Sequence, residues 1–289
     1  MSVASLVVAG LEVNVYSASP ITIERKSQEV AVFFLLHGRY GSAKEIDPIA
    51  RSVINQTGGN KRALFIVTFD QRNHGQRLVD PKGNDAWSKD RGKHNERHAV
   101  DMYAIQTGTA RDVSLLIDFL PSFLYPDNEP HPIVEWGVAG ISLGGHATWI
   151  SLATDKRIKT GIPIIGCPDY IKLITYRAQQ VGVELEGPTF PKSFRDTIEA
   201  LDPPFLGQGT ENPFIGKRIL VLSGEADRLV PWEASKAFVD KLDVGKDGVK
   251  TVILHPGVGH KCTDMMVKQT AEFIAKYCLQ AFNAHTAAL

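Results

Sequence analysis

The sequence has few cysteines and no long hydrophobic run, and both deficits narrow the class of protein. Its three cysteines, Cys167, Cys262 and Cys278, are odd in number and widely spaced, which is typical of reduced thiols rather than a disulfide framework. No apolar segment is long enough to span a bilayer. The apolar residues 1–10 lack the basic region of a signal peptide and continue into an alternating pattern. We therefore expect a cytoplasmic protein with no membrane span.

The chain also lacks an excess of charge of either sign. Lys+Arg and Asp+Glu number 32 each, which gives a formal net charge of zero. Proteins that bind nucleic acid through bulk charge carry a clear basic excess, so no nucleic-acid partner is expected. Internal repeats and low-complexity tracts are absent as well. We therefore predict a single domain over residues 1–289.

Apolar runs alternate with amphipathic segments along most of the chain. Strands are predicted over Val30–Leu36, Ala63–Phe69, 133–139, 162–166, 218–223 and 250–255, and helices over 43–55, 105–120 (ending before Pro121), 145–154, 233–242 and 263–282. This alternation predicts a mostly parallel sheet with helices on both faces. Two strand-like pieces at 6–17 and 21–25 flank a turn signal and predict an antiparallel start to the sheet.

Two segments interrupt the alternation. Residues 71–101 are polar and rich in His, Asn, Arg and Lys, which suits a long ordered loop excursion, and residues 170–215 carry five prolines and suit a cap or lid insertion. Both follow predicted strands, and open α/β sheets bind ligands at the carboxyl ends of their strands. Either segment could form the main lid, and the pattern does not choose between them.

A glycine-flanked serine follows the strand predicted at 133–139. In Gly140-Ile141-Ser142-Leu143-Gly144, the glycines leave room for a sharp strand-to-helix turn that projects the serine from the end of a sheet. Ser142 is therefore the candidate nucleophile. The alternative is a glycine-rich turn with no catalytic role.

An acid and a base follow later strands. Asp227 comes after the strand at 218–223 and His260 after the strand at 250–255, and the chain order Ser, Asp, His is that of nucleophile-elbow hydrolases. Because a serine hydroxyl is a poor nucleophile, His260 would take its proton, and Asp227 would orient and stabilise the imidazole. Asp169 is the alternative partner of the base.

The reaction also needs donors for the tetrahedral oxyanion. One is the backbone N–H of Leu143, directly after the nucleophile. The second is expected from the loop after the strand Val30–Leu36, where Arg39 is the first choice and Tyr40 the neighbouring alternative. The alternative is that His37-Gly38 only ends the strand.

Together these residues resemble the α/β-hydrolase superfamily, in particular its serine esterase, lipase-like and S9-peptidase-like members. The matching positions follow successive strands: His37-Gly38, Asp70 to Gly75, Gly140 to Gly144, Gly224 to Asp227 and Gly259-His260. The resemblance implies an eight-stranded sheet, an acyl-enzyme mechanism without a cofactor, and a cap. It also implies a structural hydrogen bond by His74 beneath the oxyanion loop. A serine at the elbow disfavours dehalogenase, epoxide hydrolase and dienelactone hydrolase chemistry.

The predicted function is a serine hydrolase acting on a small-molecule acyl substrate, a small or medium carboxylic ester, with no cofactor and no metal. An acyltransferase, thioesterase or peptidase with the same triad is the alternative, and a non-catalytic binding protein is the alternative from another class.

His94 and His98 are four residues apart around Glu96 and could share a helix face as metal ligands, but a third ligand is missing. The sequence does not predict the oligomeric state.

Overall fold

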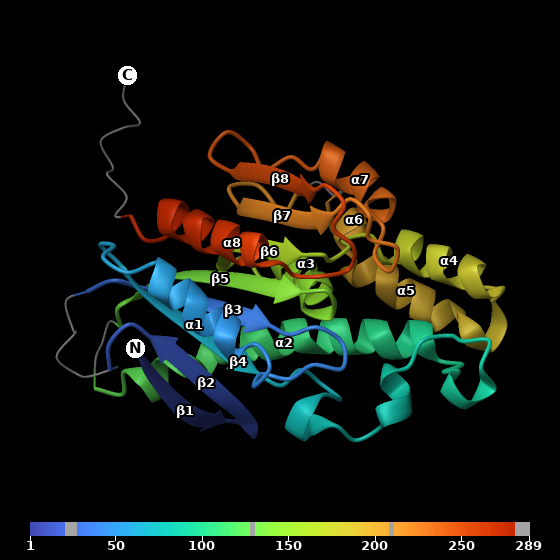
Figure 1. Cartoon of the computed structure of the whole chain (residues 1–289), viewed down its shortest axis with the longest axis horizontal. Helices are drawn as coiled ribbons and strands as arrows, with labels where there is room; N and C mark the ends of the chain where they lie inside the picture. Colours follow the sequence, from blue (N-terminus) through green and yellow to red (C-terminus); the bar gives the residue numbers. More distant parts are fainter. Residues whose placement is uncertain (21–27, 128–130, 208–210, 281–289) are drawn as a thin grey trace.

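A single sheet of eight strands forms the centre of the molecule in the computed structural model, which describes residues 1–20, 28–127, 131–207 and 211–280 (Figure 1). The strand order is β1-β2-β4-β3-β5-β6-β7-β8. The strands are β1 (Ser2–Val8), β2 (Leu11–Ser17), β3 (Val30–Leu36), β4 (Ala63–Phe69), β5 (Ile133–Ile141), β6 (Ile158–Ile164), β7 (Arg218–Gly224) and β8 (Val249–His255). The pairs from β4 to β8 are parallel, so the predicted mostly parallel sheet is confirmed.

The antiparallel start of the sheet lies elsewhere than predicted. The prediction of one strand over 6–17 is wrong, because β1 and β2 form a hairpin that pairs Val8 with Leu11. Ala9 and Gly10 turn the chain with φ values of 49° and 80°, as a two-residue hairpin turn requires. Apolar residues stand on both sides of this turn, so the periodicity concealed it. The strand predicted at 21–25 lies outside the described residues.

Two layers of helices cover the sheet. The helices are α1 (Asp47–Gln56), α2 (His98–Leu124), α3 (Leu143–Thr154), α4 (Tyr170–Val181), α5 (Lys192–Leu201), α6 (Pro203–Leu206), α7 (Trp232–Lys241) and α8 (Asp264–Tyr277). Alternate residues of β3 enter two separate apolar cores: Phe34 packs with residues of α2 and α3, and Phe33 packs with residues of α1 and α8. Burial on both faces explains the uninterrupted apolar run of this strand.

Helix α2 is longer at both ends than the pattern predicted. It begins at His98, inside the segment expected to be a polar loop, and continues through Pro121. Proline removes one helical hydrogen bond and normally breaks a helix interior. Here it stands in the last turn, where the Tyr125 N–H still reaches the Pro121 carbonyl at 2.8 Å and Leu120 is fully buried. Packing of the last turn therefore outweighs the missing bond.

The two excursions lie together at the end of the sheet toward which the parallel strands point (Figure 1). The first contains the short 3₁₀ helices η2 (Gly75–Arg77), η3 (Pro81–Asn84) and η4 (Arg91–Lys93), and the second contains α4, η5 (Gly187–Thr189), α5 and α6. Trp87 from the first and Tyr170, Phe190 and Phe194 from the second share one apolar cluster with α2 and α3. The excursions thus pack as one layer over the strand ends.

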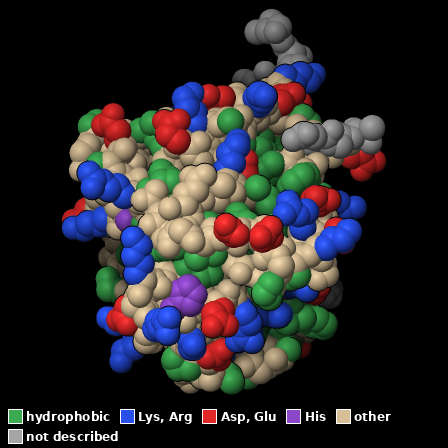
Figure 2. Space-filling model, turned by 90° about the vertical axis from the view of Figure 1, so that its right-hand side faces the viewer, with side chains coloured by type: hydrophobic (Ala, Val, Ile, Leu, Met, Phe, Trp, Pro, Cys, Tyr) green, Lys and Arg blue, Asp and Glu red, His purple; other side chains and the backbone are tan. Residues whose placement is uncertain are grey.

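The outer surface of this end carries charges of both signs. Figure 2 shows Lys and Arg side chains interspersed with Asp and Glu side chains and with hydrophobic ones. Neither sign dominates the face, in line with the zero net charge. Within the described ranges, no helix is both long enough and apolar enough to cross a membrane.

Candidate active site

Ser142 stands on a strained turn between β5 and α3. Its backbone has φ 54° and ψ −108°, a combination that is costly for a residue with a side chain. Two hydrogen bonds hold the turn: the Ser142 N–H donates to the Ile164 carbonyl at 2.9 Å, and the Gly144 N–H donates to the His37 carbonyl at 3.1 Å. The ends of β3 and β6 therefore fix the serine from both sides.

The glycines of this turn are required by close backbone contacts. A Cβ on Gly140 would overlap the Gly144 carbonyl, and a Cβ on Gly144 would lie 2.5 Å from the Leu36 carbonyl oxygen. Neither glycine has a positive φ, so the reason is space rather than backbone freedom. The same steric argument was made from the sequence.

The structure brings the predicted nucleophile, base and acid together. His260 Nε2 lies 2.8 Å from Ser142 Oγ, and His260 Nδ1 lies 2.7 Å from Asp227 Oδ2. The alternative acid, Asp169, is engaged elsewhere: it accepts from the Lys172 N–H at 3.0 Å and pairs with the Lys172 ammonium at 3.1 Å. Asp169 caps α4 and does not contact the histidine.

Asp227 is held as an ionised, oriented acceptor. Its side chain is fully buried, and its Oδ1 accepts from the N–H groups of Leu229 and Val230 at 2.9 Å each. Burial raises the pKa of Asp227, but the hydrogen bond from His260 and those from the two backbone N–H groups outweigh it, and the pKa lies below its usual value. Because Oδ1 is fully engaged, Oδ2 is left to orient the imidazole.

Of the two predicted oxyanion donors, Leu143 follows Ser142 directly, and Arg39 belongs to the loop that packs against it. Leu143 is the first residue of α3, where backbone N–H groups have no partner within the helix. The β3 loop packs against the nucleophile, since a Cβ on Gly38 would lie 3.8 Å from the Ser142 Cβ, and Arg39 follows directly. The alternative, Tyr40, is 59% exposed and donates from its hydroxyl to Asp85 at 3.1 Å.

A buried histidine fixes the β3 loop. The His37 ring accepts from the Gln71 N–H at Nε2, 3.0 Å away, which leaves its Nδ1 to donate to the Gly38 carbonyl at 2.8 Å. Burial lowers the pKa of His37 to about 4, so this neutral tautomer persists at neutral pH. The His74 ring lies beside it with 5.3 Å between centroids and donates from Nδ1 to the Arg72 carbonyl at 2.9 Å.

Sequence reasoning missed His146, which lies one helical turn beyond Ser142. Its N–H donates to the Ser142 carbonyl at 2.9 Å, and its Nδ1 lies 2.8 Å from the Cys167 nitrogen. Burial lowers the pKa of His146 to about 3, so the ring is neutral beneath the site. The signal was its spacing of four residues from the serine on the following helix.

The metal-ligand alternative has no support in the geometry. Helix α2 begins at His98, so His94 precedes it and does not share a helix face with His98. The Nδ1 of His94 lies 2.8 Å from the Ser88 carbonyl oxygen. In the part of the chain that the structure describes, no three His, Cys, Asp or Glu side chains are grouped as metal ligands.

Cys262, two residues after His260, is a free thiol. Burial raises its pKa to about 11, so the thiol is protonated at neutral pH. A protonated thiol is a weak nucleophile, so Cys262 does not compete with Ser142 as the candidate nucleophile.

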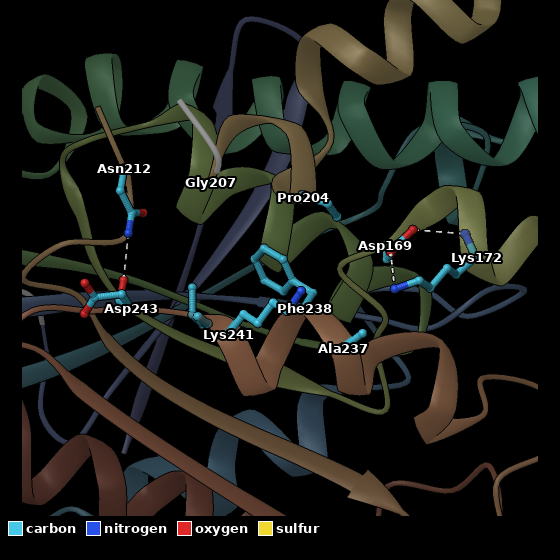
Figure 3. A pocket seen from close by; sticks show the side chains of 10 residues that line it. Asp169, Lys172, Pro204, Gly207, Asn212, Ala237, Phe238, Lys241 and Asp243 are labelled. Carbon is cyan, nitrogen blue, oxygen red and sulfur yellow. Dashed lines mark hydrogen bonds and ion pairs between the residues drawn. The ribbon is translucent and has the colours of Figure 1, made fainter. Parts of the chain in front are cut away.

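A separate cavity of about 380 Å³ lies between α4, α6 and α7 (Figure 3). Phe238 forms part of its wall, and Lys172, Lys241 and Asp169 contribute charges of both signs. None of the triad candidates lines it. This cavity is therefore not formed by the triad candidates.

Comparisons with known proteins support the architecture. No protein-family model matches the sequence, and no curated protein matches it. Among solved structures, TT1662 from Thermus thermophilus is similar over 96% of this chain and 98% of its own, with 19% identity and a TM-score of 0.67. Est1E from Butyrivibrio proteoclasticus, with ferulic acid bound, is similar over 95% of this chain and 97% of its own, at 15% identity and a TM-score of 0.58.

A peptidase structure is similar over part of its length. The acylaminoacyl peptidase of Pyrococcus horikoshii matches 96% of this chain and 41% of its own, with 14% identity and a TM-score of 0.58. These identities are low, and the likeness is one of overall fold. The chain has the α/β-hydrolase fold.

Proposed function

We propose that this chain is a serine hydrolase that cleaves a small or medium carboxylic ester through an acyl-enzyme on Ser142. The observation that carries the proposal is the continuous hydrogen-bonded chain from Ser142 Oγ through His260 to Asp227, at 2.8 and 2.7 Å. These separations allow proton transfer without rearrangement. The strained backbone of Ser142 supports it further, because such strain is concentrated at functional sites.

The residues divide the reaction into two steps. Ser142 Oγ attacks the ester carbonyl carbon while its proton passes to His260 Nε2, and the N–H groups of Leu143 and Arg39 receive the oxyanion. His260 then returns the proton to the departing alcohol. In the second step His260 deprotonates water, which attacks the acyl-enzyme. The bond from the acyl carbon to Ser142 Oγ then breaks, His260 returns the proton to Oγ, and the acid leaves. Asp227 stays ionised and stabilises the imidazolium in both steps.

Covalent labelling tests the nucleophile directly. A fluorophosphonate probe should attach to Ser142, and Ser142→Ala should abolish both labelling and hydrolysis of p-nitrophenyl butyrate while leaving the unfolding midpoint in urea unchanged. Ser193→Ala, at an exposed position on α5, should retain both labelling and ester hydrolysis. A folded wild-type protein that neither labels nor hydrolyses esters graded in acyl length would overturn the proposal and favour a binding protein.

The same acyl-enzyme could pass its acyl group to an alcohol or amine, or could form from a thioester or peptide. The triad geometry is common to all these reactions. Product analysis with added alcohol and amine acceptors separates transfer from hydrolysis. We favour hydrolysis as the reaction to test first because it needs no second binding site.

A further inference from the structure

Two arginines near the site lack the carboxylate partner that comparable arginines have. Partly or fully buried arginines elsewhere in the fold each lie within 4.0 Å of a carboxylate: Arg51, Arg62, Arg77 and Arg218. Arg39 and Arg177 are also partly buried, yet no carboxylate of a described residue lies within 4.0 Å of either. The other described arginines without an ion pair are exposed: Arg91, Arg111, Arg195 and Arg228.

Arg177 extends from the cap helix α4 to the loop that carries the proposed catalytic acid. Its Nη2 makes a long hydrogen bond of 3.4 Å to the Leu229 carbonyl, two residues after Asp227. Its Nε is buried and has no hydrogen-bond partner in the described structure. A buried donor on a charged group is costly to leave unpaired. Burial, and then the positive charge of Arg39, lower the pKa of Arg177 to about 10, so it remains a cation at neutral pH.

Arg39 belongs to the loop whose Gly38 packs against Ser142. Its guanidinium makes a long contact of 3.4 Å with the Asn84 carbonyl and lies 5.0 Å from the centroid of the Tyr40 ring. These contacts leave most of its donors unpaired, because a guanidinium has five.

The positive charges of the two guanidinium groups affect the same histidine. After burial, the charge of Arg177 and that of Arg39 both contribute to the lowered pKa of His146, as does His260. Arg39 follows Gly38, which packs against Ser142, and Arg177 bonds to the loop that carries Asp227, so both cations belong to segments beside the triad candidates. The carboxylate of this region, Asp227, is already engaged by His260 and two backbone N–H groups.

Neither cation has a carboxylate counterion among the described residues, and an anion bound to both would relieve their mutual repulsion and pair their donors. The planar fork of arginine matches carboxylate and phosphate groups. We propose that the substrate of Ser142 carries an anionic group, a carboxylate or a phosphate, which Arg39 and Arg177 bind. This inference rests on the proposed function and specifies its substrate class: half-esters of dicarboxylic acids, or esters whose alcohol carries the anion.

The test compares matched anionic and neutral esters. Monomethyl glutarate is paired with dimethyl glutarate, 3-acetoxypropionate with its methyl ester, and 2-acetoxyethyl phosphate with 2-acetoxyethanol, and released acid is titrated. At least one anionic member should have a kcat/KM ten times or more that of its neutral partner. Arg177→Met should reduce this ratio about tenfold or more, since one charged hydrogen bond is worth at least that factor. Arg177→Lys should retain part of it.

The control is Arg111→Met, which removes an exposed, unpaired arginine from α2 and should leave the ratio unaltered. Fluorophosphonate labelling of each variant establishes that the site is folded. The ester pair whose anionic member is preferred identifies whether the anion is a carboxylate or a phosphate. It also identifies whether the anion lies on the acyl or the alcohol side of the ester.

Failure of this inference is distinguishable from failure of the proposed function. Hydrolysis of neutral esters without preference for any anionic partner, and with an unchanged ratio in Arg177→Met, would overturn the anion site alone. If no ester is hydrolysed, calorimetric titration of glutarate and inorganic phosphate into Ser142→Ala and its Arg177→Met derivative still decides the question. Binding that is at least tenfold weaker in the Arg177→Met derivative supports the anion site. Equal binding to the two proteins, or no binding to either, overturns it.

Discussion

At the scale of single residues, the bond between His260 and Asp227 decides how well the proposed base works. The bond is 2.7 Å long and its carboxylate is completely buried. Oδ1 is anchored by two backbone N–H groups, so the acid cannot rotate to serve another partner. The imidazole is therefore held with its Nε2 toward Ser142.

Asp227→Asn tests this arrangement. The amide cannot stabilise an imidazolium and favours the wrong histidine tautomer, so kcat on p-nitrophenyl butyrate should fall by about 10³- to 10⁴-fold. Steady-state kinetics measure the ratio of the wild-type kcat to that of Asp227→Asn. Asp169→Asn is the matched control, because Asn retains the capping function at α4 and the kinetics should stay within about fivefold of wild type. A loss below tenfold in Asp227→Asn would remove Asp227 from the proposed triad.

The triad candidates predicted from the sequence are those that follow a strand within a few residues. Ser142, Asp227 and His260 each stand after an apolar run, and parallel strands gather such positions at one edge. Arg177 was not found because its proximity to the site depends on how α4 packs, whereas His146 was overlooked although it lies only four residues after Ser142. No local pattern encodes the approach of α4 to the loop after β7.

At the scale of elements, the strand-turn-helix unit of β5 and α3 tolerates no additional atom. A Cβ on Gly145 would lie 2.8 Å from the Ile164 carbonyl oxygen, and one on Gly140 would overlap the carbonyl of Gly144. The unit is thus packed backbone against backbone, which explains the glycines at positions 140, 144 and 145.

Gly140→Ala should therefore destabilise the fold and displace Ser142. We expect the free energy of unfolding to fall by about 1–3 kcal/mol or more, as for overpacking in a dense core, together with slower fluorophosphonate labelling. Urea denaturation measures the first effect. Gly58→Ala is the control, because its Cβ would meet its nearest neighbour at 4.0 Å; it should change stability by no more than about 0.5 kcal/mol. Equal stability of the two variants would contradict the steric account.

Most strands and helices were predictable because they are long, apolar and regularly spaced. The strands at Val30–Leu36 and Ala63–Phe69 match their predicted bounds. The errors fall where tertiary contacts override a local rule: the continuation of α2 past Pro121 is held by burial of Leu120 and its neighbours. The hairpin turn at Ala9 and Gly10 escaped detection because a short polar turn signal was absent.

At the scale of the whole molecule, buried neutral histidines couple stability to pH. Burial is the main cause that lowers the pKa of His37 to about 4 and those of His98 and His146 to about 3. In the unfolded chain each titrates near its usual value of about 6.5. Their contribution is complete above that pH and is lost as the pH falls from about 6.5 toward 4 and 3, because only the unfolded state takes up the protons.

The free energy of unfolding should therefore drop between pH 7 and pH 5. The contribution of each histidine to the free energy of unfolding falls by about 2 kcal/mol between pH 7 and pH 5. Asp202 opposes this change, because burial raises its pKa well above the usual value and the proton it keeps favours the folded state as the pH falls. We expect a net loss of a few kcal/mol, measured by urea denaturation at pH 7, 6 and 5. Asp202→Asn should steepen the decline, and a flat profile would contradict buried neutral histidines.

The triad candidates lie far apart along the chain, so enzymatic activity reports whether distant strands have assembled into the sheet. Ser142 and His260 are 118 residues apart, and Asp227 and His260 are 33 apart. Their geometry exists only when β5, β7 and β8 have all joined the sheet, which needs long-range loop closure. In a refolding experiment, recovery of turnover would thus mark the assembly of the C-terminal strands, separately from the earlier gain of helix seen by circular dichroism.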